Sequence, residues 1–221
     1  MHFSIDNLNS IKDKIKSISK SNNIVDKSIE IVAVSKTFKM SCIKPLIDYG
    51  HDHYGENKVQ EAIEKWTDVK IKNDQIKLHL IGKLQTNKVK HAVKIFDYIH
   101  SVDSIKLARK IADEQEKIGK KIKLFIQVNI GSEEQKSGID EKSLEELNLE
   151  CINLDLNVIG LMCIPPNNNN PSVYFKKMRE LANRLNLKDL SMGMSSDYLN
   201  AIKEGSTFVR VGSKIFGERS K

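Results

Sequence analysis

The sequence predicts a single (β/α)8 TIM barrel of the α/β class with an extra N-terminal helix. Eight short runs rich in β-branched residues alternate with longer segments whose apolar residues recur at intervals of three and four. The runs are almost continuously apolar, which is typical of parallel strands covered on both faces, and parallel strands need crossover helices. With 221 residues, 39% of them hydrophobic, the chain suits one compact barrel. We therefore expect a single domain over residues 1–221.

The N-terminal helix is predicted over residues 1–20, where the apolar residues are spaced as on one face of an amphipathic helix. The strands that follow are short β-branched runs. In chain order they are expected at residues 29–36, 51–57, 77–83, 97–104, 123–130, 156–164, 189–195 and 206–213.

The connecting segments have the apolar period of helices. Ile105, Ala108, Ile111 and Ala112, for example, fall on one helical face. The one low-complexity patch, "IPPNNNNP" at residues 164–171, reads as a loop because prolines and asparagines favour turns. The helices are expected at residues 42–50, 59–69, 87–96, 104–119, 141–154, 171–186 and 197–205.

The charge pattern favours a solvated surface. The formal net charge is +7, but the lysines are interspersed with glutamates along the predicted helices. Only 6% of the residues are aromatic, so the chain lacks the interleaved rings on which nucleic-acid bases stack. We expect no nucleic-acid partner, and a salt-sensitive shift of RNA or DNA would test that alternative.

Cysteine usage and the lack of targeting segments favour a cytoplasmic location. The three cysteines, Cys42, Cys151 and Cys163, form no CxxC and have no regular spacing, so a disulfide framework or a zinc site has little support. The N-terminus lacks the uninterrupted apolar core of a secretory signal. No run approaches the roughly 20 apolar residues that a membrane helix needs, so we expect no membrane partner.

Lys36 ends the first predicted strand, within the stretch "IEIVAVSKTFKM". Barrel chemistry lies at the C-terminal ends of the strands, and in an extended strand Lys36 shares a face with Val32 and Val34. Desolvation there lowers the pKa of an ammonium from about 10.4, and the neutral amine can form a Schiff base with an aldehyde. The alternative is a strand-end lysine that extends to solvent.

Small polar residues follow the seventh and eighth predicted strands, where barrels commonly bind phosphate. Ser195 and Ser196 precede a helix that Gly205 terminates. Gly212 allows close backbone approach to a ligand, and Ser213 offers a hydroxyl and an N–H at the start of a further turn. Each serine cluster alone suits a helix cap, but two clusters at adjacent strand ends indicate an anion site.

Arg210 alternates with Val209 and Val211, so it points into the barrel together with Phe208 if the valines pack against the helices. A buried guanidinium needs a partner. That partner is either a structural carboxylate or a ring nitrogen of a bound cofactor. A lysine for an aldehyde, a cradle for a phosphate and an arginine between them together describe pyridoxal 5′-phosphate (PLP).

Ordered motifs along nearly the whole chain carry a resemblance to a known family. The chain resembles the pyridoxal phosphate homeostasis proteins, whose members have the barrel of the alanine racemase N-terminal domain. The motifs are "AVSKT" at 33–37, "GENKVQEA" at 55–62, "HLIGKLQTNK" at 79–88, "KSGI" at 136–139, "GLMCIPP" at 160–166, "LSMGMSSD" at 190–197 and "GSTFVRVGSKIFGER" at 205–219.

The resemblance implies the following site. Lys36 matches the lysine that forms the Schiff base, and Arg210 matches the residue that faces the pyridine nitrogen. The positions that hold the phosphate are matched by Ser195, Gly212 and Ser213.

Two further positions follow from the same resemblance. Asn57, at the end of the second strand, matches a residue of the cofactor pocket, and its type also suits a cap for the next helix. Lys136, after the fifth strand, is a candidate second lysine that receives or passes on the aldehyde. A lysine in the charged loop "GSEEQKSG" also suits a merely solvated position.

The resemblance implies a PLP-binding protein that holds the aldehyde reversibly, maintains vitamin B6 homeostasis and releases PLP to apo-enzymes. The alternative is a PLP-dependent amino-acid racemase of the alanine racemase type. Such racemases carry a second, β-rich domain and an opposing tyrosine base from the partner subunit, whereas this chain ends after the eighth strand. Arginine also has no proton to give to the ring. We therefore expect no robust catalysis, and a monomer.

A racemase would need an acid or base opposite Lys36, for which Tyr54, His53 and His79 are the candidates near strand ends. His79 also suits a hydrogen-bonded core histidine. The "HDH" of residues 51–53 lacks a third ligand, so we expect no metal site.

Overall fold

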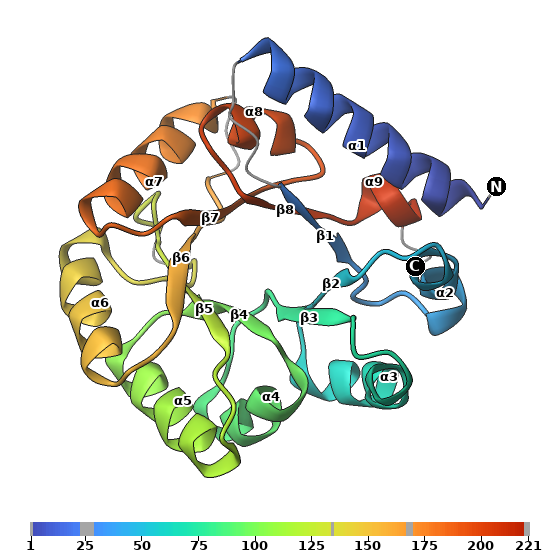
Figure 1. The fold of residues 1–221 in the computed structure, drawn as a ribbon. Helices are drawn as coiled ribbons and strands as arrows, with labels where there is room; N and C mark the ends of the chain where they lie inside the picture. Colours follow the sequence, from blue (N-terminus) through green and yellow to red (C-terminus); the bar gives the residue numbers. More distant parts are fainter. Residues whose placement is uncertain (1, 23–28, 134, 167–169, 219–221) are drawn as a thin grey trace.

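The computed structural model describes residues 2–22, 29–133, 135–166 and 170–218. Eight parallel strands close into a barrel in the order in which they occur along the chain, with β1 paired to both β2 and β8. This confirms the predicted barrel and all eight strands (Figure 1). They are β1 (Glu30–Val34), β2 (His53–Glu56), β3 (Lys77–Leu80), β4 (Tyr98–Val102), β5 (Lys123–Gln127), β6 (Val158–Met162), β7 (Asp189–Met194) and β8 (Phe208–Val211).

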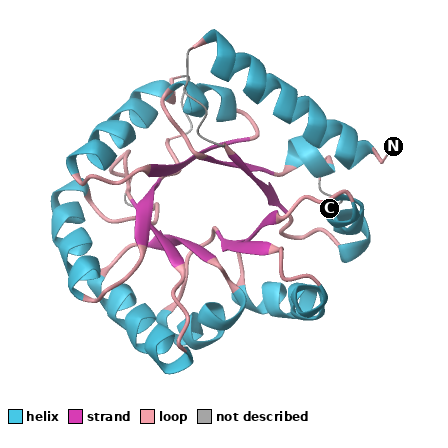
Figure 2. Ribbon diagram, in the orientation of Figure 1, coloured by secondary structure: helices cyan, strands magenta, loops and turns pink. Residues whose placement is uncertain are grey.

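The helices form a ring around the barrel (Figure 2). The predicted N-terminal helix is confirmed as α1, and it packs against α2, α8 and α9 outside the closure of β1 and β8. The helices are α1 (Phe3–Ser21), α2 (Met40–Asp48), α3 (Val59–Lys72), α4 (Val89–Ile95), α5 (Ile105–Ile118), α6 (Leu144–Asn153), α7 (Ser172–Arg184), α8 (Tyr198–Lys203) and α9 (Ser213–Phe216), with 3-10 turns at Thr86–Lys88 and Glu141–Ser143.

Strand alternation separates two apolar layers. A small cluster fills the barrel interior, formed by Val32, Tyr98, Phe125, Met162 and Phe208. The other strand face packs against the helices, and Val209 and Val211 lie there as predicted. Arg210 therefore points inward with Phe208.

The strands are shorter than the sequence predicts, and one difference concerns the candidate site. β1 ends at Val34, so Lys36 lies in the turn that follows and is not the last strand residue. The predicted loop at 164–171 is described only at its ends, because residues 167–169 lie outside the described residues. Within the described ranges, no helix is long and apolar enough to cross a membrane.

Candidate functional site

The turn that carries Lys36 is fixed on both sides of the lysine. The Ser35 hydroxyl donates to Glu56 Oε1 at 2.7 Å, and the Thr37 backbone N–H donates to Glu61 Oε1 at 2.6 Å. Thr37 has a φ of 69°, a left-handed conformation that costs a non-glycine residue free energy. The carboxylates therefore hold the backbone of Lys36 in a turn that the chain would not adopt unaided.

Lys65 on α3 joins these carboxylates. Its ammonium donates to Glu56 at 3.0 Å, to Glu61 at 2.9 Å and to the Ser35 carbonyl at 3.0 Å. Glu56 is fully buried and also accepts from the Trp66 indole N–H at 3.0 Å. The motif "GENKVQEA" predicts no role for its two glutamates, Glu56 and Glu61, and the structure places both beside the end of β1.

The predicted phosphate residues lie together at the ends of β7 and β8. The Gly212 backbone N–H donates to Ser195 Oγ at 3.3 Å, which joins the two loops. A Cβ on Gly212 would contact Val34 at 3.3 Å, so the end of β8 also lies close to the end of β1. Ser213 follows as the first residue of α9 and is exposed.

The predicted capping role of Ser195 and Ser196 is wrong. The N-cap of α8 is Asp197, whose carboxylate accepts from the Met194 N–H at 2.6 Å. Because Asp197 closes this turn, the Ser195 hydroxyl faces Gly212. Gly205 follows the helix with a φ of 89°, which confirms it as the terminator.

Arg210 is 4% exposed and sits inside the barrel at the end of β8. Its guanidinium donates to the Ser191 carbonyl at 2.6 Å, to Ser191 Oγ at 2.7 Å and to the Cys163 carbonyl at 2.8 Å. Burial lowers the pKa of Arg210. None of these hydrogen bonds goes to a carboxylate, so the structural carboxylate considered from the sequence is not its partner within the described chain.

Asn57 follows β2, and its backbone lies against the loop after β3. A Cβ on Gly82 would lie 2.4 Å from the Asn57 carbonyl oxygen, so only glycine permits this approach. The predicted cap is wrong, because Lys58 is the N-cap residue of α3 and no side chain caps this helix. The side chain of Asn57 is thus not engaged at the helix N-cap.

Substituting Gly82 tests this approach. We expect Gly82→Ala to lower the free energy of unfolding by about 1–3 kcal/mol and to weaken PLP binding, because the Asn57 backbone must shift. Chemical denaturation and PLP titration measure the two effects. The control is Gly119→Ala at the end of α5, which has nothing within 4 Å and should lose stability only through its positive φ. Unchanged PLP binding in Gly82→Ala would show that the contact between Gly82 and the Asn57 backbone does not contribute to the PLP site.

Lys136 belongs to a different strand end from the other predicted residues. It follows β5, whereas the other predicted residues follow β7, β8, β1 and β2, which are neighbours in the barrel. Its ammonium forms an ion pair with Glu133 and donates to the Pro165 carbonyl at 3.0 Å. The chain therefore brings together Lys36, Asn57, Ser195, Arg210, Gly212 and Ser213 on four adjacent strands, and it places Lys136 after β5.

The three candidate acids and bases are engaged elsewhere. The Tyr54 ring packs outside the barrel against Trp66, and its hydroxyl donates to the His51 carbonyl at 3.0 Å, so Tyr54 does not face the barrel interior. His53 and His79 lie inside the barrel and share a hydrogen bond of 2.8 Å. His79 is fully buried, as the core alternative requires. In the part of the chain that is described, no three His, Cys, Asp or Glu residues are grouped to hold a metal.

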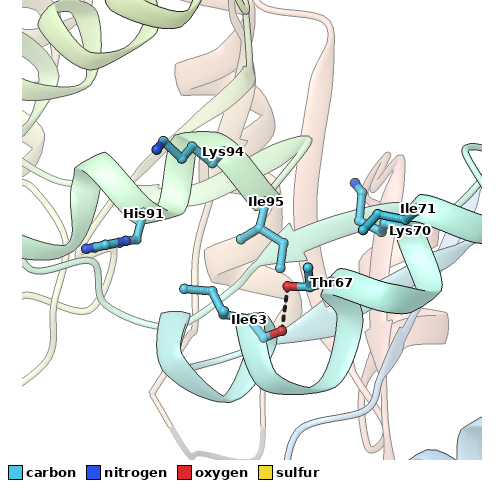
Figure 3. A pocket seen from close by; sticks show the side chains of 7 residues that line it. All are labelled: Ile63, Thr67, Lys70, Ile71, His91, Lys94 and Ile95. Carbon is cyan, nitrogen blue, oxygen red and sulfur yellow. Dashed lines mark hydrogen bonds between the residues drawn. The ribbon is translucent and has the colours of Figure 1, made fainter.

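A pocket of about 420 Å3 opens on the outer side of the barrel between α3 and α4 (Figure 3). One of its residues, Thr67, donates to the Ile63 carbonyl of its own helix, and another, Lys70, forms an ion pair with Asp97. The lining contains none of the predicted PLP residues. It consists of Ile63, Thr67, Lys70, Ile71, His91, Lys94 and Ile95.

Comparison with known proteins identifies the family. The family model described as alanine racemase, N-terminal domain, matches residues 7–220. The pyridoxal phosphate homeostasis protein of Aquifex aeolicus is 40% identical over 200 residues, which cover 86% of this chain and 87% of that protein. The chain belongs to the pyridoxal phosphate homeostasis protein family. The family member of Haemophilus influenzae is 36% identical and covers 97% of this chain and 95% of its own length.

A solved structure supports the same assignment. PipY of Synechococcus elongatus with PLP bound is 34% identical, has a TM-score of 0.77 and matches 92% of this chain and all of its own. Alanine racemase of Clostridium difficile is 16% identical with a TM-score of 0.73, and this chain covers 58% of it. At that identity the racemase shows only the shared barrel fold.

The site of this family member fits PLP. Lys36 would supply an amine for the aldehyde, Ser195 and the backbone of Gly212 would face the phosphate, and the Arg210 guanidinium has hydrogen bonds only to neutral acceptors. A side chain at position 212 would press on Val34, so glycine allows the ends of β8 and β1 to lie close together.

Proposed function

We propose that the protein binds PLP reversibly on Lys36 and thereby maintains the supply of this cofactor. The observation that carries this proposal is the fixed turn of Lys36, which follows β1. This strand is paired with β8, the strand that carries Arg210 and precedes Gly212. The family names and the PLP-bound PipY structure support it.

The side chains have distinct roles in this proposal. The Lys36 amine attacks the aldehyde carbon, so that a C=N bond forms and water leaves, and water or another amine reverses the step. The Ser195 and Ser213 hydroxyls donate to the phosphate beside the Gly212 backbone, whose N–H donates to Ser195, and Asn57 lines the pocket. Arg210 donates to the pyridine nitrogen. PLP supplies a reactive aldehyde and an electron-withdrawing ring.

The same residues favour storage over catalysis. Arg210 donates a hydrogen bond but gives up no proton, so the pyridine nitrogen stays unprotonated and the ring is a weaker electron sink. His53 and His79 are hydrogen-bonded to each other, and Tyr54 points to the outer layer. We therefore propose a carrier that releases PLP to apo-enzymes in preference to an amino-acid racemase.

Titration with PLP tests this proposal. We expect a visible absorption band of a Schiff base, its loss on dialysis against a competing amine, and transfer of PLP to an apo-enzyme. Incubation with L-alanine should leave the enantiomer unchanged over the same period. Absence of the band would contradict PLP binding, whereas racemisation at an enzymatic rate would favour the racemase alternative.

Lys136 is proposed as a second lysine that passes on the aldehyde. Its amine contacts Glu133 and the Pro165 carbonyl, so it must leave these partners before it can reach an aldehyde. We expect Lys136→Ala to leave the absorption band unchanged and to slow transfer to an apo-enzyme severalfold. Lys142→Ala, in the exposed turn that follows, is the control. Equal rates of PLP transfer by the two variants would show that Lys136 has no part in the transfer.

A further inference from the structure

A line of polar side chains crosses the barrel interior below the proposed PLP site. It starts at Arg210, whose guanidinium is 2.7 Å from Ser191 Oγ. The next four residues are Ser191, His100, His79 and His53, and we call these four residues the histidine line. Their contacts are 2.8 Å from Ser191 Oγ to His100 Nδ1, 2.9 Å from His100 Nε2 to His79 Nδ1, and 2.8 Å from His79 Nε2 to His53 Nδ1.

The line ends at the base of the barrel, where β1 and β2 begin. His53 Nε2 lies 3.6 Å from the Glu30 carboxylate, whose side chain is 35% exposed. Ser191, His79 and His100 are fully buried, and two of their rings are stacked, His79 on Tyr98 and His100 on Phe125. The line therefore connects a half-buried carboxylate to the guanidinium at the other end of the interior.

The imidazoles in this line are neutral. Burial lowers the pKa of His79 and of His100 well below the usual value, and the neighbouring charge of Arg210 lowers that of His100 further. A neutral imidazole has one nitrogen that donates and one that accepts. In a row of hydrogen-bonded neutral imidazoles, every ring must therefore donate its N–H toward the same end of the row. We call this the direction of the row.

The lower end sets the direction. The Glu30 carboxylate lies 3.6 Å from His53 Nε2 and favours the tautomer with its proton on that nitrogen, so that His53 Nδ1 accepts from His79 Nε2–H. By the same rule, His79 Nδ1 accepts from His100 Nε2–H.

At the upper end, His100 Nδ1 accepts from the Ser191 hydroxyl, which leaves the lone pairs of Ser191 Oγ to accept from Arg210. With this order, each of the four hydrogen bonds from His53 Nδ1 to Arg210 has one donor and one acceptor.

We propose that the histidine line positions Arg210 and couples the charge at the base of the barrel, beside Glu30, to the ring-nitrogen end of the PLP site. This inference rests on the proposed PLP binding at Lys36. A doubly protonated His53 donates from both nitrogens, so His79 must accept at Nε2 and each later bond reverses. The reversal ends with His100 donating to Ser191, whose own hydrogen then lacks this acceptor. Protonation of His53 at acid pH therefore disturbs the hydrogen bond between Ser191 and Arg210 at the opposite end of the line.

The groups around His53 define what controls this reversal. Burial is the largest influence and lowers the pKa of His53, whereas Glu30 raises it. Other titratable or charged groups near His53 are His51 and Asp52 before β2, Lys77 and His79 on β3, Tyr98 on β4 and Lys123 on β5. Removal of the Glu30 charge therefore shifts the reversal to lower pH.

The first test needs no PLP. Nitrogen NMR of the imidazoles in the unliganded protein distinguishes Nδ1–H from Nε2–H, and the chain has only six histidines. We expect His53, His79 and His100 each to be protonated at Nε2 at neutral pH. An Nδ1–H tautomer at any of the three would overturn the proposed direction. This result stands whether or not the chain binds PLP.

The second test uses PLP binding. His79→Leu breaks the line without touching Arg210, so we expect the Kd for PLP to rise about tenfold, with an altered absorption band of the bound cofactor. His79→Gln offers one donor and one acceptor and should recover most of the loss. Wild-type affinity in His79→Leu would overturn the positioning role. Absence of PLP binding in the wild type would instead contradict the proposed function.

A third variant avoids the buried core. In Glu30→Gln the amide oxygen can still face His53 Nε2 without the charge, so PLP affinity at neutral pH should stay within about twofold of the wild type. The fall in affinity at acid pH should move to lower pH, since the pKa of His53 drops without the carboxylate. Asp74→Asn, in the exposed turn before β3, is the control and should leave the pH profile in place. Identical profiles for the two variants would overturn the coupling.

Discussion

Lys36→Ala should abolish the covalent attachment of PLP. Wild-type protein treated with PLP and borohydride should carry one phosphopyridoxyl group on Lys36, located by peptide mass mapping, and the variant should show no visible Schiff-base band. The reason is that Lys36 follows β1 in a turn held by Glu56 and Glu61, beside the strand that carries Arg210. Lys36 is also the one lysine among the six predicted residues at the ends of β1, β2, β7 and β8.

The matched control is Lys39→Ala. Lys39 lies three residues further along, is exposed and forms the N-cap position of α2 without a side-chain cap. It should retain the full adduct and the full band. Scattered labelling of surface lysines in the wild type, or an adduct that survives in Lys36→Ala, would mean that Lys36 is the solvated lysine considered as the alternative. Non-covalent PLP binding should remain in Lys36→Ala, because the phosphate donors are unchanged.

Lys65→Met should cause the largest loss of stability. Lys65 is 11% exposed and donates to Glu56, Glu61 and the Ser35 carbonyl. Methionine keeps the volume but leaves the fully buried Glu56 without its counter-charge, so we expect the free energy of unfolding to fall by about 3–5 kcal/mol. PLP binding should weaken as well, because the Lys36 turn loses its anchor. Denaturant unfolding and PLP titration measure both effects.

Lys44→Met is the control for Lys65→Met. Lys44 forms an exposed i,i+4 pair with Asp48 on α2, with 65% of its side chain accessible. Solvent screens that pair, so its removal should cost at most about 0.5 kcal/mol. Similar losses in the two variants would show that the network under the Lys36 turn contributes no more than a surface ion pair.

The loss in Lys65→Met should also depend on pH. Burial raises the pKa of Glu56, and Lys65 is among the groups that oppose this shift. Without Lys65 the pKa rises further, so the folded state binds more protons than the unfolded state between the two pKa values. Stability then falls as pH rises through that interval. The difference between variant and wild type should therefore be smaller at acid pH than at neutral pH, and a loss independent of pH would contradict this account.

Local sequence patterns predicted the strands and their order, because apolar runs and helical periods depend on nearby residues. They also predicted that Lys36 and Ser195 end strands and that Arg210 points inward from the eighth strand. The boundaries were less accurate, since Lys36 lies beyond β1. The caps were wrong because Asp197 and Lys58 occupy the N-cap positions that Ser195 and Asn57 were expected to serve.

Other features depended on the register of the closed barrel. Tyr54 alternates with His53 and Gly55, and only the pairing of β2 with its neighbours decides that Tyr54 faces the helices. Glu56 on β2 and Lys65 on α3 lie close in sequence, but they form an ion pair only because α3 folds back over β2.

Apolar period and order along the chain were enough to predict the barrel and its eight strands, because both depend on local sequence, but they placed the end of β1 at Lys36 instead of Val34. Only the tertiary structure decided which buried polar groups meet. His100 and Ser191 are 91 residues apart and form a hydrogen bond because β4 and β7 face one interior. Such a contact has no local pattern, because it depends on closure of the whole barrel. The physical reason is that a buried polar group must find a partner, and barrel closure decides which partners lie within reach.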